Sequence, residues 1–270
     1  MIRLLACLLA LLAWPGLASK AQAVERLVSL APSLSEIVLE LEAADLLVGM
    51  LDGGERPPAL AEVPSVGRYG QLEMESLLRL QPDLVLLWPD SIGPAQRQQL
   101  LDFGIPLLIV EPRDLATLAE QFAEIGRRIG RAEQGRQLRQ RFGTRLHGLA
   151  TRYRRERPLR VFYQIWDKPL YTIGGRQIIS DALRVCGAEN VFADLSLPAP
   201  QVSIEAVLQR DPEVILAGSG AQLDIWKHWP DLAAVRLDQL WAVPDKGLER
   251  PSFQMLDATE QLCERLAAAQ

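Results

Sequence analysis

The stretch that decides the fold is residues 131–156, RAEQGRQLRQRFGTRLHGLATRYRRE, which has the pattern of one long helix. Its apolar side chains recur at intervals of three and four residues, so a helix with 3.6 residues per turn carries them in a single stripe. These side chains are Leu138, Phe142, Leu146, Leu149 and Tyr153. Pro158 ends the pattern, because proline cannot continue a helix. At about 1.5 Å per residue the helix is about 35–40 Å long, roughly the width of a small lobe.

Short apolar segments alternate with helical patterns on both sides of this stretch. Residues 84–88 and 106–110 read as buried strands, and residues 115–129 read as a helix. Residues 33–36, Ser-Leu-Ser-Glu, have the spacing of a capping box and predict a helix start. Continuous apolar strands that alternate with helices are typical of parallel sheets covered on both faces.

The architecture that we expect is therefore α/β, with two Rossmann-like lobes whose sheets are parallel. A single long helix joins the lobes, and a ligand cleft lies between them. We expect an N-terminal lobe over residues 24–127, the connecting helix over 128–157 and a C-terminal lobe over 158–270. Taken alone, the helix could equally be an ordinary surface helix within one large domain.

The two halves of the chain share a gapless internal repeat. Residues 74–86, MESLLRLQPDLVL, align with residues 204–216, IEAVLQRDPEVIL, at a constant offset of 130. Two equivalent lobes explain this better than one domain does, and the repeat is too long for a short-period solenoid. Glu75 and Glu205 occupy equivalent positions near the two helix starts. They either interact favourably with the helix dipole or form a pair of exposed carboxylates that meet two basic sockets on a partner.

Residues 1–23 have the pattern of a signal peptide. A positive charge at Arg3 precedes an apolar run, and the tripeptide AQA that ends at Ala23 predicts cleavage after Ala23. We therefore expect export to the periplasm. The formal net charge is −5 at pH 7, and it becomes more negative when Arg3 and Lys20 leave with the signal peptide. An acidic exported protein is a poor candidate for binding nucleic acid or an anionic membrane surface.

Cys186 and Cys263 are the only cysteines after the signal peptide. In an oxidising compartment two thiols suggest a disulfide, and two buried free thiols are the alternative. A disulfide would close a loop of about 77 residues and stabilise the fold by about 4–5 kcal/mol in the chain-entropy account. No metal site is expected, because His147 and His228 are the only histidines and neither lies near a cysteine in the sequence.

Aromatic residues gather where predicted strands and turns end. Trp88 and Trp166 each end a predicted strand, and Tyr171 follows Trp166 closely. Tyr69 lies in the loop Gly-Arg-Tyr-Gly. Ligands of parallel α/β sheets bind outside the carboxyl ends of the strands, so these side chains could line a cleft for a large, flat, partly apolar ligand. Each of them alone could instead be a packing residue.

Glu249 and Arg250 precede the last predicted helix. They are either a solvated pair that contributes almost nothing to stability or polar anchors that orient a ligand. The sequence contains no G-x-S-x-G motif, no P-loop and no histidine beside a plausible nucleophile. We therefore expect a binding protein rather than an enzyme, and an exported α/β enzyme is the alternative from another class.

These segments resemble the periplasmic substrate-binding proteins that have two Rossmann-like lobes joined by a single long helix. Members of this family deliver corrinoids, haem and siderophores to ABC importers. The resemblance covers essentially the whole chain after the signal peptide and is greatest to the cobalamin-binding members. It is carried by VSLAPSLSEIVLELEA, ESLLRLQPDLVLLW, RVFYQIW, ALRVCGAENVF, PQVSIEAVLQRDPEVIL and the last helix with Cys263.

The resemblance implies a periplasmic receptor, expected to be a monomer, that delivers cobalamin (vitamin B12) to an ABC importer in the inner membrane. It implies a disulfide between Cys186 and Cys263. It also implies that Glu75 and Glu205 dock onto arginines of the membrane permease, one in each lobe. The contacts around a corrin that it implies are Tyr69, Trp88, Tyr171, Glu249 and Arg250, and Trp166 could replace a lost contact.

The chain departs from these members at Gly53, Ala199, Gly247 and Leu248, where they carry aromatic residues. A receptor of the same fold for haem or a ferric siderophore is therefore the alternative. A siderophore with carboxylates or catecholates would favour a cleft rich in arginine. The arginines that could contribute to such a cleft are Arg68, Arg176 and Arg250.

Overall fold

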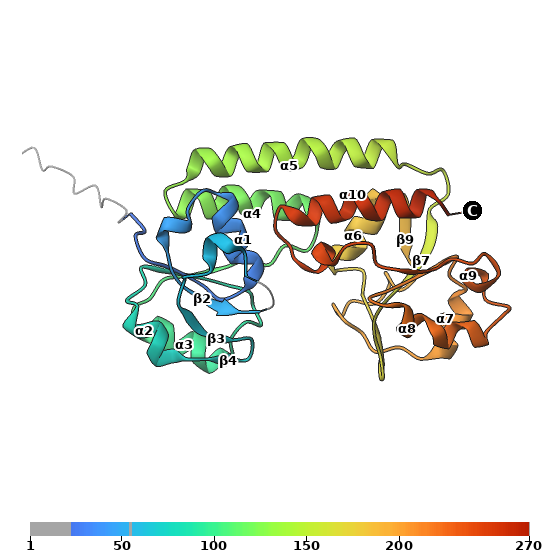
Figure 1. Cartoon of the computed structure of the whole chain (residues 1–270), viewed down its shortest axis with the longest axis horizontal. Coiled ribbons are helices and arrows are strands. Elements are labelled where there is room, and N and C mark those ends of the chain that lie inside the picture. Colours follow the sequence, from blue (N-terminus) through green and yellow to red (C-terminus); the bar gives the residue numbers. More distant parts are fainter. Residues whose placement is uncertain (1–22, 54–55, 270) are drawn as a thin grey trace, which may run out of the picture.

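The computed structural model describes residues 23–53 and 56–269 and contains two α/β lobes side by side beneath a long helix (Figure 1). The predicted signal peptide lies outside the described residues except for Ala23, so its cleavage stays a prediction. Among the described residues, no helix combines the length and the apolar character that crossing a bilayer requires.

The N-terminal lobe is built on a six-stranded sheet in the order β4-β3-β2-β1-β5-β6. Its strands are β1 (Leu27–Ser29), β2 (Leu47–Asp52), β3 (Ser65–Arg68), β4 (Gln71–Leu72), β5 (Leu84–Leu87) and β6 (Leu107–Ile109). All neighbours are parallel except β3 and β4. The strand predicted over residues 84–88 is β5, which is fully buried between β1 and β6.

The C-terminal lobe has a second sheet in the order β11-β10-β7-β8, with β9 paired to β7. Its strands are β7 (Leu159–Asp167), β8 (Leu170–Thr172), β9 (Ala188–Asn190), β10 (Val214–Ala217) and β11 (Leu240–Ala242). The pairs are parallel except for β7 and β8, which form an antiparallel hairpin. The expected architecture of two lobes with largely parallel sheets is confirmed.

Helices cover both sheets. The α-helices are α1 (Pro32–Glu40), α2 (Met74–Arg79), α3 (Pro94–Asp102), α4 (Leu115–Arg128), α5 (Ala132–Arg152), α6 (Ile178–Val185), α7 (Ile204–Arg210), α8 (Gly220–Leu223), α9 (Ala233–Arg236) and α10 (Gln254–Ala267). The capping box predicted at residues 33–36 is wrong. The helix begins at Pro32, Ala31 is its N-cap, and no side chain caps it. Proline starts a helix well because its fixed φ suits the first turn and its missing N–H would have no partner there.

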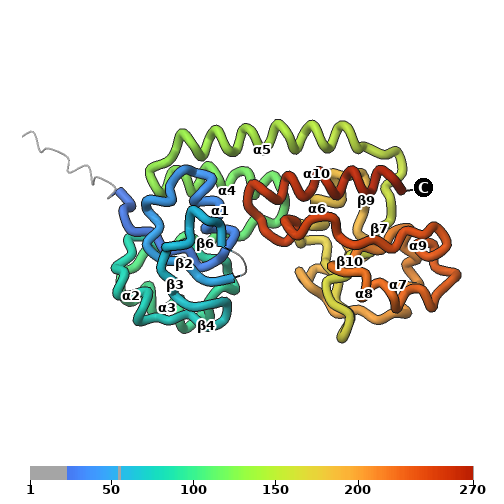
Figure 2. Tube along the Cα trace, in the orientation of Figure 1, coloured from blue at the N-terminus to red at the C-terminus, as the bar shows by residue number. Residues whose placement is uncertain are grey.

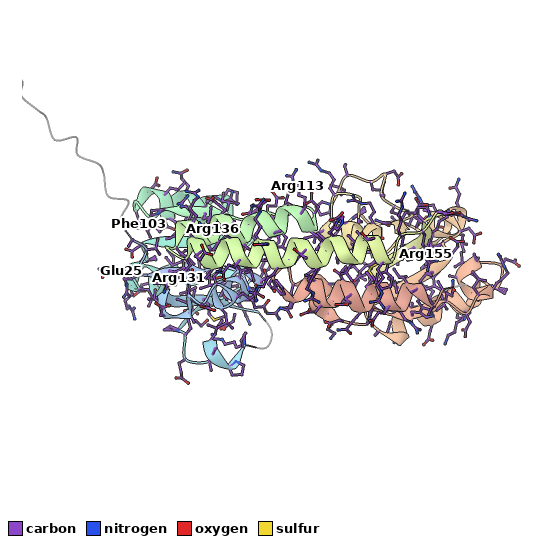
Figure 3. The ribbon with its side chains drawn as sticks, turned by 90° about the horizontal axis from the view of Figure 1, so that it is seen from above. Glu25, Phe103, Arg113, Arg131, Arg136 and Arg155 are labelled. Atoms are coloured by element: carbon purple, nitrogen blue, oxygen red, sulfur yellow. A yellow bond between two sulfur atoms is a disulfide. The ribbon has the colours of Figure 1, made fainter. Side chains whose placement is uncertain are left out.

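The long helix is α5, which runs along the edge of both lobes (Figure 1). Seen from above, it lies in front, with Arg131 near one end and Arg155 near the other (Figure 3). The predicted apolar stripe is confirmed, because Leu138, Phe142 and Leu149 are buried. The helix is shorter than the expected 128–157, and the lobe boundaries stay a prediction.

A neighbouring helix supports α5 along its first half, because the chain folds back between α4 and α5. The two helices approach so closely that a Cβ on Gly126 would lie 2.9 Å from the Cα of Gly135. Only glycine permits backbones to come this near to each other. The turn between them follows α4 directly, which is why α5 starts later than the sequence pattern suggested.

The internal repeat is confirmed in three dimensions, because α2 and β5 in one lobe correspond to α7 and β10 in the other. Gln81 and Asp211 are one repeat apart, and both have a left-handed backbone, with φ of 46° and 41°. Residues 71–80 and 201–210 also show the same order of exposed, half-buried and buried side chains. Each lobe therefore presents a closely similar surface at this place.

The lobes also touch through the segment that precedes α10. Glu36 on α1 is 8% exposed and pairs with Arg250, and it accepts a hydrogen bond of 3.0 Å from Ser252 Oγ. Glu40, one turn later, accepts the N–H of Phe253 at 2.9 and 3.0 Å. Figure 2 shows this part of the chain running up to the N-terminal lobe before it turns back into α10. The long helix is therefore not the only connection between the lobes.

An aromatic cluster strengthens this second connection. The rings of Phe122 on α4 and Phe142 on α5 meet edge to face, with centroids 5.3 Å apart. Phe253 packs on both, at 6.4 and 5.7 Å. Aromatic pairs in such arrangements contribute about 0.5–1.5 kcal/mol beyond their buried area. The cluster ties α4, α5 and the C-terminal segment into one unit.

A disulfide joins Cys186, at the end of α6, to Cys263 on α10, with 77 residues between them in the sequence. The expected pairing is confirmed, and the alternative of two free thiols is excluded. Both cysteines are buried, at 2% and 0% exposure. The bond connects the last helix to the helix that faces the N-terminal lobe.

The contact between Glu40 and Phe253 predicts a dependence of stability on pH. Burial raises the pKa of Glu40 from its ordinary 4.5 to about 8; the Phe253 N–H opposes this rise and the charge of Glu36 adds to it. Between these values the unfolded chain has lost a proton that the folded chain retains, so stability falls as pH rises from about 4.5 to about 8. Glu40→Gln keeps the acceptor for Phe253 and should raise the free energy of unfolding at pH 8 by about 1–2 kcal/mol.

Urea unfolding at pH 5 and pH 8 measures this effect. The gain from Glu40→Gln should be much smaller at pH 5, where the native side chain is protonated. Glu42→Gln, at an exposed position two residues away, is the matched control and should change stability little at either pH. Equal stability changes for Glu40→Gln at both pH values would contradict the assignment.

Candidate functional site

A cavity of about 500 Å³ lies between the two lobes and is lined by residues from both. On the N-terminal side it is formed by residues 31–33, 88–91 and 111–113, which follow β1, β5 and β6, together with Tyr69. On the C-terminal side it is formed by residues 176–178 at the start of α6 and by parts of the 196–198 and 248–251 segments. The expected cleft at the carboxyl ends of parallel strands is therefore present.

Prolines make up much of the wall of this cavity. They are Pro32, Pro89, Pro112, Pro198 and Pro251. Proline has a fixed φ and no N–H, so each one stiffens the backbone and removes a potential hydrogen-bond donor from the wall. The cavity is therefore a rigid and largely apolar surface, and its polar contacts must come mainly from a small number of side chains. Ligand pockets of proteins commonly have this composition.

Three of the predicted ligand contacts line the cavity. Trp88 is half-buried, and its indole Nε1 donates to Ser33 Oγ at 3.1 Å, which fixes the ring against α1. Tyr69 is 65% exposed at the turn between β3 and β4, where its ring is free to cover a ligand. Glu249 is exposed on the opposite wall. An aromatic pair on one lobe thus faces a carboxylate on the other.

The structure does not place the other three predicted contacts in the lining. Trp166 is 56% exposed on the β7–β8 hairpin, where its Nε1 donates to the carbonyl of Lys168 at 3.2 Å. Tyr171 pairs with Trp166 across that hairpin, and Arg250 pairs with Glu36. The sequence predicts that the strand ends at Trp166 and that this residue lies at the cleft. In the structure the strand continues to Asp167 and forms an antiparallel hairpin with β8. Ligand contact by these three residues stays a prediction.

Other polar residues of the lining were missed by the sequence reasoning. Asp90, Glu111 and Arg113 follow β5 and β6 in the same way as Trp88, so their positions after predicted strands were the signal that could have found them. The prediction that residues 106–110 form a buried strand is wrong in its burial, because β6 is an edge strand and Ile109 is 46% exposed. Glu111 and Arg113 are paired at 3.4 Å. Arg176, considered above only for a siderophore, lines the cavity from the other lobe. The lining therefore carries both signs of charge, with slightly more acidic than basic groups.

A buried hydroxyl lies close to this wall. Tyr163 on β7 is 1% exposed, and its hydroxyl has no hydrogen-bond partner among the described residues. Burial raises the pKa of Tyr163, and the charge of Glu249 adds to the effect. The phenol therefore stays neutral at all physiological pH values.

Glu75 and Glu205 lie outside the cavity lining, on α2 and α7. These helices lie on the side of their lobes away from α5 (Figure 1). The Glu75 side chain is 89% exposed and pairs with Arg79 at 2.9 Å, and Glu205 is exposed as well. The pKa of Glu205 is lowered by hydrogen bonds from its own backbone N–H and from the side chain of Ser203. Both carboxylates are therefore available to a partner on the surface.

Within residues 23–53 and 56–269, no three His, Cys, Asp or Glu side chains are grouped so that they could hold a metal ion. The polar side-chain groups of the cavity are carboxylates, guanidinium groups, hydroxyls and the carboxamide of Gln177. Their arrangement can accept and donate hydrogen bonds to a bound molecule from both lobes.

Comparison with known proteins gives consistent results. The model of the family described as "Periplasmic binding protein" matches residues 27–243. A vitamin B12-binding protein of Vibrio cholerae serotype O1 is 35% identical over 272 residues, which cover 100% of this chain and 98% of that protein. A vitamin B12-binding protein of Vibrio parahaemolyticus is 31% identical and covers 96% of this chain and 95% of that protein.

Solved structures agree with the sequence comparisons. The periplasmic vitamin B12 binding protein BtuF of Vibrio cholerae superimposes with a TM-score of 0.83 at 34% identity, covering 92% of this chain and 98% of that one. The periplasmic heme binding protein HutB of Vibrio cholerae gives a TM-score of 0.78 at 20% identity, covering 89% of this chain and 98% of that one. The second likeness concerns the fold alone.

Proposed function

Because this chain belongs to the periplasmic binding protein family, we propose that it captures cobalamin between its lobes and delivers it to an ABC importer in the inner membrane. The observation that carries the proposal is the cavity at the strand ends, where Trp88 and Tyr69 on one lobe face Glu249 on the other. A flat ring system can lie against the aromatic side chains while its polar substituents reach the charged groups. The relatives named as vitamin B12-binding proteins support this cargo.

The charges of the lining favour cobalamin over an anionic siderophore. Among the three arginines considered for a siderophore, Arg68 bonds to Gln71 and Arg250 pairs with Glu36, so only Arg176 lines the cavity. Arg113 also lines it, but Glu111 is its partner. A strongly anionic ligand needs an excess of basic groups, whereas a mixed rim suits a ligand with many neutral amide groups.

Haem is the second candidate cargo, and Tyr69 is the observation that favours it. A tyrosine can act as an axial ligand of haem iron, and Tyr69 is the lining residue that offers this chemistry. A haem receptor of this kind should lose its haem when Tyr69 is replaced with phenylalanine, whereas a cobalamin receptor should lose little affinity from the same change.

A direct binding experiment tests the cargo. The mature protein is mixed with cyanocobalamin, free ligand is removed on a desalting column, and the visible spectrum of the protein fraction is recorded. We expect a corrin band at one cobalamin per protein. A parallel sample with haem should retain no band, and a haem band without a corrin band would overturn the proposed cargo.

Trp88→Ala should weaken cyanocobalamin binding by about tenfold or more, which corresponds to about 1.4 kcal/mol. The substitution removes an indole that lines the cavity and is held in place by Ser33. Equilibrium titration of the visible spectrum measures the change. Trp229→Ala is the matched control, because Trp229 is 39% exposed and does not line the cavity. Equal affinities for both variants would contradict a role of Trp88 in cargo binding.

We further propose that the protein acts as a monomer in the periplasm after signal-peptide removal, and that it binds its cargo without chemical change. A chromatographic comparison of cobalamin before and after incubation with the protein tests the last point. A converted product would favour the alternative of an exported α/β enzyme.

A further inference from the structure

Arg176 supplies a positive charge on the C-terminal wall of the cargo cavity. It is exposed, lines the cavity and directly precedes the N-cap of α6. The backbone before it is firmly held, because the N–H of Gly175 donates to the carbonyl of Leu195 at 3.0 Å. A Cβ on Gly175 would lie 2.0 Å from the carbonyl oxygen of Ala193, so only glycine permits this approach. Main-chain contacts therefore fix the place of Arg176 at the rim of the cavity.

The guanidinium group of Arg176 has no carboxylate partner among residues 23–53 and 56–269. The other arginine of the lining, Arg113, is paired with Glu111. Asp181 is the acidic residue nearest to Arg176 in the sequence, but its carboxylate accepts the N–H of Leu115 on α4 at 2.8 Å. Arg176 therefore keeps a charge that a bound molecule can neutralise.

The rest of the wall is poorly suited to an anionic group. Its five prolines have no N–H to donate. At the start of α6 the N–H of Ile179 is already satisfied, because the side chain of Gln177 accepts it at 2.5 Å. Asp90 is exposed after β5 on the opposite wall, where its charge would repel an anion. An anionic group of a bound molecule is therefore best placed beside Arg176.

Cobalamin has an anionic group that matches this charge. Its corrin ring carries neutral amide side chains, and its nucleotide loop contains a phosphodiester with a single negative charge. A guanidinium group binds phosphate oxygens through parallel, charge-assisted hydrogen bonds. The unpaired arginine of the lining is therefore complementary to the phosphodiester, whereas a corrinoid without the nucleotide loop offers it no anionic partner.

We propose that Arg176 binds the phosphodiester of the cobalamin nucleotide loop. This inference rests on the function proposed above and adds the class of cargo to it: complete cobamides, which have the loop, bind more tightly than corrinoids that lack it. It also assigns an orientation to the cargo. The corrin face that bears the nucleotide turns toward α6 in the C-terminal lobe, and the opposite face turns toward Trp88 and Tyr69 in the N-terminal lobe.

A series of three ligands tests this contact. Dissociation constants are measured by titration of the visible spectrum for cyanocobalamin, for a cyanocobamide that carries adenine as its base, and for dicyanocobinamide, which lacks the whole nucleotide loop. Arg176→Gln should weaken the binding of both complete cobamides by about tenfold, as expected for the loss of a charge-assisted hydrogen bond. Dicyanocobinamide has no phosphodiester, so its binding should not respond, and that binding also shows that the variant is folded.

Two further substitutions separate the effects of charge, geometry and position. Arg176→Lys keeps the positive charge but loses the planar fork of donors, so it should retain part of the preference for complete cobamides. Arg184→Gln is the matched control, because Arg184 lies on α6, pairs with Asp181 at 3.0 Å and does not line the cavity. This control should bind all three ligands as the unmodified protein does.

Failure of this inference and failure of the proposed function give different results. If the unmodified protein binds none of the three corrinoids, the proposed function is wrong. If it binds them but Arg176→Gln weakens all three equally, or weakens none, the contact with the phosphodiester is wrong. A loss for cyanocobalamin alone, with the adenine cobamide unaffected, would assign the contact to the base and would also overturn the inference.

Discussion

Replacing Glu75 and Glu205 together with alanine should abolish cobalamin uptake through the importer and leave cobalamin binding unchanged. The reason is that the two carboxylates are exposed on α2 and α7 and do not line the cargo cavity. Loss of one desolvated charge contact at an interface typically costs about 2–5 kcal/mol, so the loss of two should reduce uptake by a factor of at least about 100.

Growth of cells that depend on this protein for cobalamin, together with binding of cyanocobalamin to the purified variant, measures both halves of this result. A matched control replaces two exposed glutamates elsewhere, Glu189 on β9 and Glu264 on α10, so that the net charge changes equally. Normal uptake by the variant without Glu75 and Glu205 would show that these two glutamates are not needed for docking. Loss of uptake in the control variant would show that net charge, and not position, decides it.

Removing the disulfide should lower the free energy of unfolding by about 4–5 kcal/mol, because the bond closes a loop of 77 residues. For a chain of this size such a loss corresponds to a fall of about 10–15 °C in Tm. The effect should extend to the cargo cavity, because Cys186 ends α6 while the start of the same helix lines the cavity. Cobalamin binding should therefore weaken as the temperature approaches the lowered Tm.

Thermal unfolding of the double variant Cys186→Ala, Cys263→Ala measures this loss. Treatment of the unmodified protein with a reductant provides a second test without any change in side-chain volume. A fall in Tm for the double variant but none on complete reduction would assign the loss to the cavities left by the two side chains. Equal falls in Tm for the double variant and the reduced protein would assign the loss of stability to the missing disulfide.

Patterns of neighbouring residues in the sequence predicted the long helix and the internal repeat. The stripe that runs from Leu138 to Leu149 identified the long helix, because periodic burial on one face is visible in the sequence. The repeat of residues 74–86 in 204–216 identified two lobes, because equivalent helices, turns and strands carry similar residues at the same spacing. The capping box at residues 33–36 failed, because Pro32 starts the helix two residues earlier than an N-cap at Ser33 would.

The same reasoning predicted only some of the residues of the candidate site. Trp88 follows a buried strand, and the rule that ligands bind at strand ends placed it in the cavity correctly. Trp166 follows the same rule in the sequence, but β7 continues into a hairpin and carries Trp166 out of the lining. Arg250 was expected beside Glu249 in the cleft, yet its guanidinium pairs with Glu36, which is 214 residues away in the sequence.

The sequence by itself determined the elements, the two-fold repeat and the pair of equivalent glutamates, because periodicity and repetition are properties of neighbouring residues. Only the tertiary structure decided which side chains meet between the lobes. Examples are the pairing of Glu36 with Arg250 and the packing of Phe253 on Phe122, which depend on how the lobes fold onto each other. Contacts between residues so far apart leave no local signal, since burial and charge pairing are satisfied only in three dimensions.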